Sequence, residues 1–321
     1  MESLDQHLLV LEPQYRERVW GGQRLHPADP PVGEAWIAFG SSVVATGPLA
    51  GRTLGELSQQ VGADLLGTVV AARFGVRFPL LVKLLDCADW LSVQVHPDDA
   101  QAKTMVGPDE VGKTEAWYFI DTSPEARIIA GVKPGIGQEE LSAAIREGTV
   151  LDVAAEVSVQ AGDAILIPAG TLHALGPGLF LYEIQQASDT TYRAYDWGRP
   201  QSAGRKLHIE ESAAVARPLE PAERTHPAPG KTTGTAPAVA SAYFNLELAR
   251  VAAAQPLAGD TDGRSFHVLT AIDGSAEVTC QNETARLNRF ETVVATAGAG
   301  PYAIRAIEGP VTLLRASVPG S

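Results

Sequence analysis

Cysteine is scarce in this sequence: the 321 residues contain only Cys87 and Cys280, which lie far apart. This excludes a framework of disulfides and a zinc site made of thiolates, and it favours a reducing, cytoplasmic location. Long apolar runs are absent as well, so no membrane-spanning helix is expected. The N-terminal segment lacks a basic start followed by an apolar run, and no signal peptide is expected.

Positive charge is also in short supply. Lysine and arginine number 25 against 38 aspartates and glutamates, which gives a formal net charge of −13. A surface this acidic argues against nucleic acid or an anionic membrane as a partner. It would also repel a phosphorylated substrate at long range, so any phosphate site must be a local basic pocket.

Aromatic residues make up only 6% of the chain, whereas glycine (31) and proline (22) are frequent. Short apolar runs between glycine and proline turns predict a mainly β protein, a sandwich or barrel with a few short helices. Helices are expected at 53–66, opened by a capping box, and at 138–147 and 208–216. The proline-rich segment 217–240 predicts a linker, so two domains are expected, at 1–216 and 241–321.

A short internal similarity joins the two halves of the chain. Residues 163–175 (DAILIPAGTLHAL) align with 291–304 (ETVVATAGAGPYAI) when their Ala-Gly dipeptides are superposed. The alignment places His173 opposite Pro301. If the halves are related, the second copy has lost this imidazole; the alternative is a chance similarity between two glycine-rich turns.

The strongest local pattern is GDAILIPAGTLH, from Gly162 to His173. Gly162 is expected to make a hairpin turn and the AILI run a strand, after which Pro168 and Gly170 turn the chain so that His173 points inward. The pattern matches the second motif of the cupins, without the usual trailing asparagine. The alternative is an ordinary hairpin with a histidine on the surface.

Polar side chains occupy one face of the segment LSVQVHPDD (91–99). Alternation along a strand directs Ser92, Gln94 and His96 to one side and the intervening apolar residues to the other. A face of this kind is either exposed to solvent or lines a cavity.

Lys113 and Glu115 are likewise two residues apart, at the start of an expected strand. They are either a solvated ion pair or part of a site. With Gln94, His96 and His173, the carboxylate of Glu115 would make a plausible zinc set of nitrogen and oxygen ligands. Iron(II) competes for two histidines and one carboxylate, whereas Mg²⁺ and Ca²⁺ take more oxygens.

The last polar cluster is YEIQQASDTTYRAYDWGR (182–199). Glu183 lies on the strand that leaves the His173 turn, and Arg193 and Arg199 follow in a polar stretch. Arginine keeps its charge, and its planar fork fits phosphate. The alternative is a surface loop in which the arginines pair with nearby aspartates.

In combination, these segments resemble the type I mannose-6-phosphate isomerases, particularly the short bacterial form. The resemblance covers roughly residues 8 to 210 in the same order, and the QVHP, KTE and PAGTxH motifs are specific as a set. It implies two cupin (jelly-roll β-barrel) domains, a catalytic one in 1–216 and a metal-free one in 241–321. It also implies a zinc-dependent interconversion of mannose 6-phosphate and fructose 6-phosphate through a cis-enediol. The matching segments are RVWGGQRL (18–25), GEAWIAFG (33–40), LLVKLLD (80–86), LSVQVHPDD (91–99), GKTEAWY (112–118), IPAGTLHAL (167–175) and YEIQQASDTTYRAYDWGR (182–199).

The resemblance also implies roles for particular residues. It places the zinc ligands at Gln94, His96, Glu115 and His173. The other positions are an active-site lysine, a catalytic arginine, a serine that contacts phosphate and a nearby acidic residue, which fall on Lys113, Arg193, Ser92 and Glu183. The base that shuttles the proton is then Lys113, which we favour, or Glu183.

Two other functions use the same ligands. A cupin dioxygenase with Fe(II) would share the two histidines and the glutamate but has no need of Lys113 and Arg193. A non-catalytic sugar-binding cupin would keep the barrel and tolerate loss of the metal. A sugar phosphate is the expected partner of a monomer or weak homodimer. Five histidines lack partner spacing and are expected on the surface or in packing: His7, His26, His208, His226 and His267.

Overall fold

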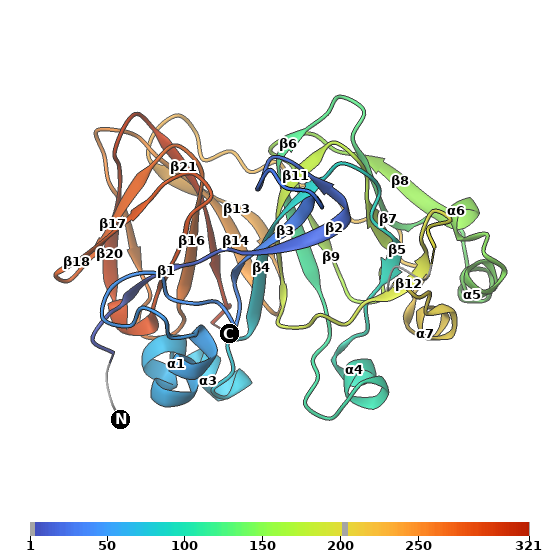
Figure 1. The fold of residues 1–321 in the computed structure, drawn as a ribbon, viewed down its shortest axis with the longest axis horizontal. Coiled ribbons are helices and arrows are strands. Elements are labelled where there is room, and N and C mark those ends of the chain that lie inside the picture. The colour runs from blue at the N-terminus through green and yellow to red at the C-terminus, as the bar shows by residue number, and fades with distance from the viewer. Residues whose placement is uncertain (1–3, 201–204, 321) are drawn as a thin grey trace. The chain divides into compact units, whose positions relative to one another are not determined.

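The computed structural model describes residues 4–200 and 205–320, and Figure 1 shows a mainly β protein with short helices, which confirms the predicted fold class. The chain divides into two compact units that are not consecutive in sequence. Unit 1 lies within Met1–Gln14, Trp36–Lys83 and His226–Ser321, and unit 2 comprises Tyr15–Ala35 and Leu84–Thr225. The division into domains at 1–216 and 241–321 stays a prediction.

Two antiparallel sheets, with strand orders β2-β3-β4-β11-β6-β9 and β12-β5-β10-β7-β8, hold the strands of unit 2; residues 36–38 of β3 and 80–83 of β4 are counted with unit 1. The strands are β2 (Gln14–Gly22), β3 (Val32–Ala38), β4 (Leu80–Cys87), β5 (Val93–Val95), β6 (Glu115–Thr122), β7 (Arg127–Val132), β8 (Ala154–Ser158), β9 (Ala164–Ile167), β10 (His173–Leu175), β11 (Leu179–Gln186) and β12 (Tyr192–Tyr195).

Apolar side chains of both sheets form one core between them, which includes Trp117, Ile128 and Leu181. The other face of the five-stranded sheet packs against α5 (Gln138–Glu147), α6 (Val150–Val153) and α7 (Ile209–Val215), which Figure 1 shows grouped beside β5, β7 and β12. Val93 and Val95 belong to that second cluster. Because side chains alternate along a strand, Gln94 must point the other way, between the sheets.

Local sequence signals explain most of the helices. α5 presents Leu141 and Ile145 to the core and ends at Gly148, whose left-handed conformation closes it as predicted. The capping box of Thr53 and Glu56 opens α1 (Leu54–Val61), also as predicted. The remaining helices are α2 (Ala63–Leu66), α3 (Thr68–Phe74) and α4 (Asp99–Met105).

Three local expectations were wrong. The helix expected at 53–66 is interrupted at Gly62, whose backbone conformation (φ 53°, ψ −111°) lies outside the helical region, and it resumes as α2. The apolar run LDVAAEVSV (151–159) predicts a strand, but its first three residues, 151–153, belong to α6. The expected linker 217–240 contains β13 (Gly234–Ala240), an edge strand with Pro237 beside a bulge, which is where a sheet tolerates proline.

Unit 1 also consists of two antiparallel sheets, with strand orders β1-β19-β16-β21-β14-β13 and β15-β20-β17-β18. A core of small and branched apolar residues fills the space between them. The remaining elements are β1 (Leu8–Leu11), β14 (Asn245–Val251), β15 (Leu257–Asp260), β16 (His267–Asp273), β17 (Ala276–Cys280), β18 (Glu283–Leu287), β19 (Thr292–Ala295), the 3-10 helix η2 (Ala297–Ala299), β20 (Pro301–Ala306) and β21 (Val311–Ser317).

The two units repeat one strand order. The neighbours β3-β4-β11-β6-β9 of unit 2 correspond to β13-β14-β21-β16-β19 of unit 1, and β5-β10-β7-β8 correspond to β15-β20-β17-β18. The expected internal repeat is therefore present in the topology. It sets His173, the first residue of β10, against Pro301, the first residue of β20.

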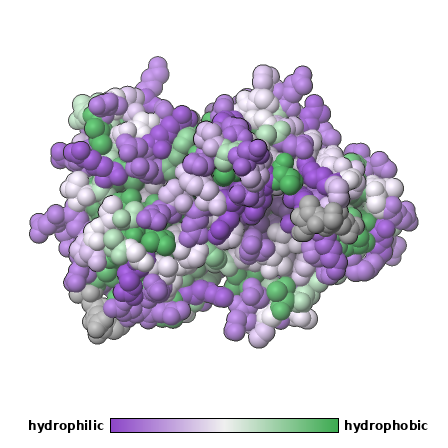
Figure 2. Space-filling model, viewed as in Figure 1, coloured by the Kyte–Doolittle hydropathy of each residue, from purple (hydrophilic) through white to green (hydrophobic). Residues whose placement is uncertain are grey.

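The face of the protein drawn in Figure 2 carries mostly hydrophilic side chains, with hydrophobic residues in small separate patches. In the part of the chain that the structure describes, no helix has the length and apolar composition needed to cross a membrane.

Candidate metal centre

Neighbouring strands bring the first of the predicted ligands together. Gln94 of β5 pairs directly with His173 of β10, so the two side chains leave the sheet on the same face. His96 follows just beyond the end of β5, and its carbonyl oxygen accepts a hydrogen bond of 2.9 Å from the N–H of Gly170. This bond ties the turn before β10 to the end of β5, and so holds the two histidines near each other.

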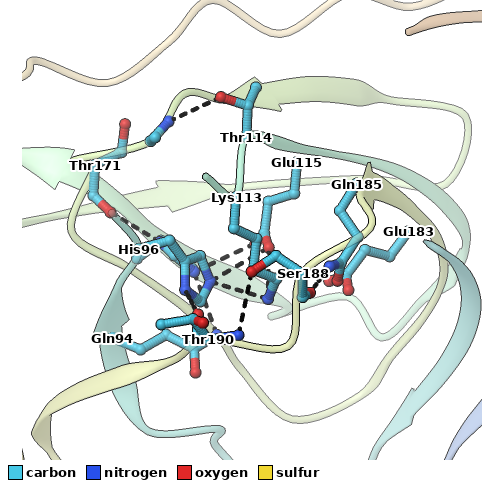
Figure 3. Close-up of polar contacts among 12 residues, drawn as sticks. Gln94, His96, Lys113, Thr114, Glu115, Thr171, Glu183, Gln185, Ser188 and Thr190 are labelled. Carbon is cyan, nitrogen blue, oxygen red and sulfur yellow. Dashed lines mark hydrogen bonds and ion pairs between the residues drawn. The ribbon is translucent and has the colours of Figure 1, made fainter. Parts of the chain in front are cut away.

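Glu115 joins the histidines from the other sheet, at the start of β6. Its Oε2 lies 3.3 Å from Nε2 of His96, and its Oε1 lies 3.2 Å from Nε2 of His173. The ligand atoms of these three residues lie within 4.8 Å of one another, and no side chain of the three is more than 1% exposed. Figure 3 shows Gln94, His96, Lys113 and Glu115 converging on this point.

Main-chain carbonyl groups fix the tautomer of both imidazoles. Nδ1 of His96 lies 2.9 Å from the carbonyl oxygen of Thr190, and Nδ1 of His173 lies 2.8 Å from that of Thr171. A carbonyl oxygen only accepts, so each Nδ1 carries the hydrogen. In the neutral rings both Nε2 atoms then turn a lone pair towards Glu115, as in histidines that bind metals.

The burial of the cluster sets its charge. Burial lowers the pKa of His96 to about 3, with the positive charge of Lys113 acting in the same direction. Burial also lowers the pKa of His173, so both rings are neutral at neutral pH. Burial alone would raise the pKa of Glu115, but the positive charge of Lys113 acts most strongly in the opposite direction, and that pKa lies well below its usual range. The cluster therefore offers two neutral nitrogens and one carboxylate.

Lys113 and Gln94 complete the cluster. Nζ of Lys113 lies 3.0 Å from Oε2 of Glu115 and 3.0 Å from Nε2 of His96. Nε2 of Gln94 lies 3.2 Å from Nε2 of His173, and a half-turn of the amide would exchange that nitrogen with the oxygen that a metal binds.

These residues fit a divalent metal ion. The Oε1 of Glu115 is buried without a hydrogen-bond partner among the described residues, whereas its Oε2 forms an ion pair of 3.0 Å with the ammonium of Lys113. A buried acceptor left in this way is costly unless a cation or donor satisfies it. Two imidazoles, one carboxylate and one amide are the kind of ligand set that zinc takes, with room left for a substrate or water.

Two of the other predicted residues, Arg193 and Glu183, lie on strands that flank the cluster. Arg193 of β12 pairs with Gln94 of β5, so the two side chains leave the sheet on the same face. The Oε2 of Glu183 on β11 accepts a hydrogen bond of 3.0 Å from Nε1 of Trp117. Ser92 is buried, two residues before Gln94, and none of the described contacts joins its side chain to the cluster. Arg199, by contrast, pairs with Asp89 and Asp196 and lies outside the cluster.

Known proteins are similar to this chain in sequence and in fold. The family model "Phosphomannose isomerase type I, catalytic domain" matches residues 8–116. A mannose-6-phosphate isomerase of Streptococcus mutans is 41% identical over 230 residues, which are 68% of this chain and 70% of that protein. A probable mannose-6-phosphate isomerase of Bacillus subtilis is 41% identical over 255 residues, 75% of this chain and 78% of that protein. The chain belongs to the type I phosphomannose isomerase family.

Solved structures of mannose 6-phosphate isomerases agree with this membership. That of Bacillus subtilis has a TM-score of 0.84 at 31% identity and covers 97% of this chain and 99% of its own. A zinc-bound mannose 6-phosphate isomerase has a TM-score of 0.74 at 17% identity, over 96% of this chain and 99% of its own, and shares the fold. The family predicted from the sequence is thus confirmed.

Several residues that support the site in this chain were not predicted from its sequence. Thr171 and Thr190 act through their carbonyl oxygens, which every residue has, so their side chains gave no signal. Gln185 donates to the carbonyl of Ser188 and so shapes the loop that leads to Thr190. His208, expected as a surface or packing residue, instead contacts the backbone of Arg193.

Proposed function

We propose that the protein interconverts mannose 6-phosphate and fructose 6-phosphate, using zinc held by Gln94, His96, Glu115 and His173. The observation that supports this best is the buried cluster of His96, Glu115 and His173, in which both Nε2 atoms face the Glu115 carboxylate and the Oε1 of that carboxylate has no hydrogen-bond partner among the described residues. Membership of the phosphomannose isomerase family supplies the sugar phosphate as substrate.

The reaction moves a proton between C1 and C2 of the open-chain sugar through a cis-enediol. When bound, zinc supplies a Lewis acid that polarises the carbonyl group and offsets the negative charge that develops on its oxygen. The neutral amide of Gln94 matters here, because Glu115 is then the only anionic ligand. The four ligands together with zinc keep a net positive charge.

Lys113 is our candidate for the group that moves the proton. Its ammonium lies 3.0 Å from atoms of two ligands and is almost completely buried, so it is close to any carbonyl held at the cluster. Glu183 is the alternative. It is also buried, and the indole of Trp117 orients its carboxylate.

Arg193 and Ser92 are proposed to bind the charged parts of the substrate. The Nε of Arg193 is buried and has no hydrogen-bond partner among the described residues. A guanidinium without a partner, in a chain of net charge −13, marks a local basic point that can stabilise the developing negative charge or hold the phosphate. Ser92 is buried just before β5, two residues ahead of Gln94, and its hydroxyl can donate to phosphate.

A coupled assay with mannose 6-phosphate tests the proposal. The purified protein is measured as isolated, after chelation, and after return of Zn²⁺ or Fe²⁺. Isomerisation should be lost on chelation and restored by Zn²⁺.

Two outcomes would contradict the proposal. Oxygen uptake with Fe²⁺ and no isomerisation would indicate a dioxygenase. Sugar-phosphate binding that survives chelation, with no turnover, would indicate a binding protein. A cytoplasmic location and a monomeric or weakly dimeric state stay predictions.

A further inference from the structure

One residue, His208, occupies the open edge of β12 beside Arg193. β12 ends its sheet and pairs only with β5. The main-chain N–H of His208 donates to the carbonyl oxygen of Arg193 at 2.8 Å, and the main-chain N–H of Arg193 donates to Nδ1 of the His208 ring at 3.3 Å. His208 thus satisfies both backbone groups of Arg193, as a neighbouring strand would do.

This arrangement affects where the Arg193 side chain points. Both backbone groups of Arg193 face His208, so its pairing with Gln94 is of the non-hydrogen-bonded kind, in which opposite side chains lie closest. The register is irregular between Arg193 and Tyr195. A strand with such an irregularity re-aims its side chains, so the edge contacts decide which way Arg193 projects.

The guanidinium group has little else to hold it. The two neighbouring arginines, Arg199 and Arg205, each form ion pairs with Asp196. Arg193 has no ion pair among the described residues, and its Nε is buried without a hydrogen-bond partner. Its direction is therefore set mainly through the backbone, at the point where His208 binds.

The chemistry of His208 suits an acceptor. A main-chain N–H only donates, so Nδ1 must carry the lone pair and Nε2 the hydrogen. Burial and the nearby charge of Arg193 lower the pKa of His208, which keeps the ring neutral. The ring also packs against Tyr192, with 5.9 Å between the ring centroids.

We infer that His208 is a positioning residue for Arg193: it replaces a missing strand and so holds the guanidinium on the face of the sheet that carries Gln94 and His173, for the isomerisation. This inference rests on the proposed function. It makes His208 a residue of the reaction that touches neither substrate nor metal.

Three substitutions of His208 test the inference, because they differ in where the side chain carries a hydrogen-bond acceptor for the N–H of Arg193. The amide oxygen in His208→Asn takes the place of Nδ1, the one in His208→Gln lies one methylene farther out, and His208→Leu has no acceptor. We expect kcat to fall about 10-fold or more in the Leu and Gln variants, because a misplaced group costs catalysis steeply. The Asn variant should stay within about threefold of the wild type. His26→Leu is a control in unit 2 and should change nothing.

A second arm combines His208→Leu with Arg193→Lys. If His208 acts through Arg193, the double variant should be no slower than Arg193→Lys alone, because the two effects are not independent. Zinc content and melting temperature are measured on every variant, and the Gln variant replaces the Leu variant if the latter does not fold.

Different results overturn different claims. A wild-type protein without isomerase activity removes the proposed function, and the inference with it. An active wild type whose Leu and Gln variants are equally active overturns only the inference. An Asn variant as slow as the Leu variant, or additive losses in the double variant, would do the same.

Discussion

The two units place equivalent strands in the same order, yet the residues at equivalent positions are chemically different. In unit 2, Glu115 begins β6 and pairs with Ile167 and Gln185 on its two sides. In unit 1, the same place at the start of β16 is taken by His267, which pairs with Ala295 and Ser317. By the same register Arg315 stands where unit 2 has Glu183.

At these equivalent positions of unit 1, the polar residues have partners within the unit. Nδ1 of His267 lies 2.7 Å from the hydroxyl of Tyr302, and Arg315 forms an ion pair of 2.7 Å with Glu247. Pro301 stands where unit 2 has His173, so one ligand is missing altogether. The comparison teaches that a shared fold gives the positions, whereas a binding site also needs polar atoms that the protein itself leaves without a partner, such as the Oε1 of Glu115.

The largest expected effect comes from replacing the residue at each of the two equivalent positions, Glu115 and His267, in separate variants. Glu115→Ala removes the only carboxylate among the proposed ligands, so zinc should be lost and kcat/KM should fall about 10³-fold or more. His267→Asn, at the matching place in unit 1, should keep zinc and activity. Metal content per chain and the coupled assay measure both.

If Glu115→Ala retained zinc and turnover, the ligand assignment would be wrong. If His267→Asn lost zinc, the two units would not be chemically separate as described.

Arg193→Ala should have the next largest effect. Losing a charged donor to a developing negative charge typically costs about 10²–10³-fold in kcat. Zinc should remain bound, because Arg193 is not among the ligands. Stopped assays of kcat with metal analysis on the same sample provide the measurement; near-normal turnover would remove Arg193 from the mechanism.

The smallest effect is on stability in unit 1. Burial lowers the pKa of His267 to about 4, and the charge of Arg315 acts in the same direction. A histidine in the unfolded chain titrates near pH 6.5, so between about pH 6.5 and 4 the unfolded state binds a proton that the folded state does not. The folded state therefore becomes less stable, relative to the unfolded state, as the pH falls through this window.

His267→Asn cannot bind that proton and should lose less stability. Between pH 7 and 4.5 the variant's loss in unfolding free energy should be smaller than that of the wild type by about 1–3 kcal/mol. Urea unfolding at both pH values gives the difference. If the unfolding free energy fell by the same amount in both proteins between pH 7 and 4.5, His267 would not titrate in this way.

Side-chain spacing predicted most of the candidate site, and main-chain contacts account for what it missed. Gln94 and His96 could be placed on one face because alternation along a strand is a property of the sequence. The role of Thr190 could not be predicted, because it acts through a carbonyl group, and the contact of His208 depends on how a distant segment returns to β12.

The fold shows the same limit. The strands and α5 follow from apolar periodicity and a terminal glycine, whereas α3 begins after Gly67, which provides no side chain to cap the helix, and was missed. β13 was missed because its proline suggested a linker, although an edge position accommodates that residue.

Because main-chain oxygens orient both imidazoles, the identities of residues 171 and 190 are not dictated by the metal. Side chains there can diverge, in evolution or by design, while the ligand geometry is preserved. In the proposed isomerase, substitutions at these two positions can thus change the lining of the site without changing the metal ligands.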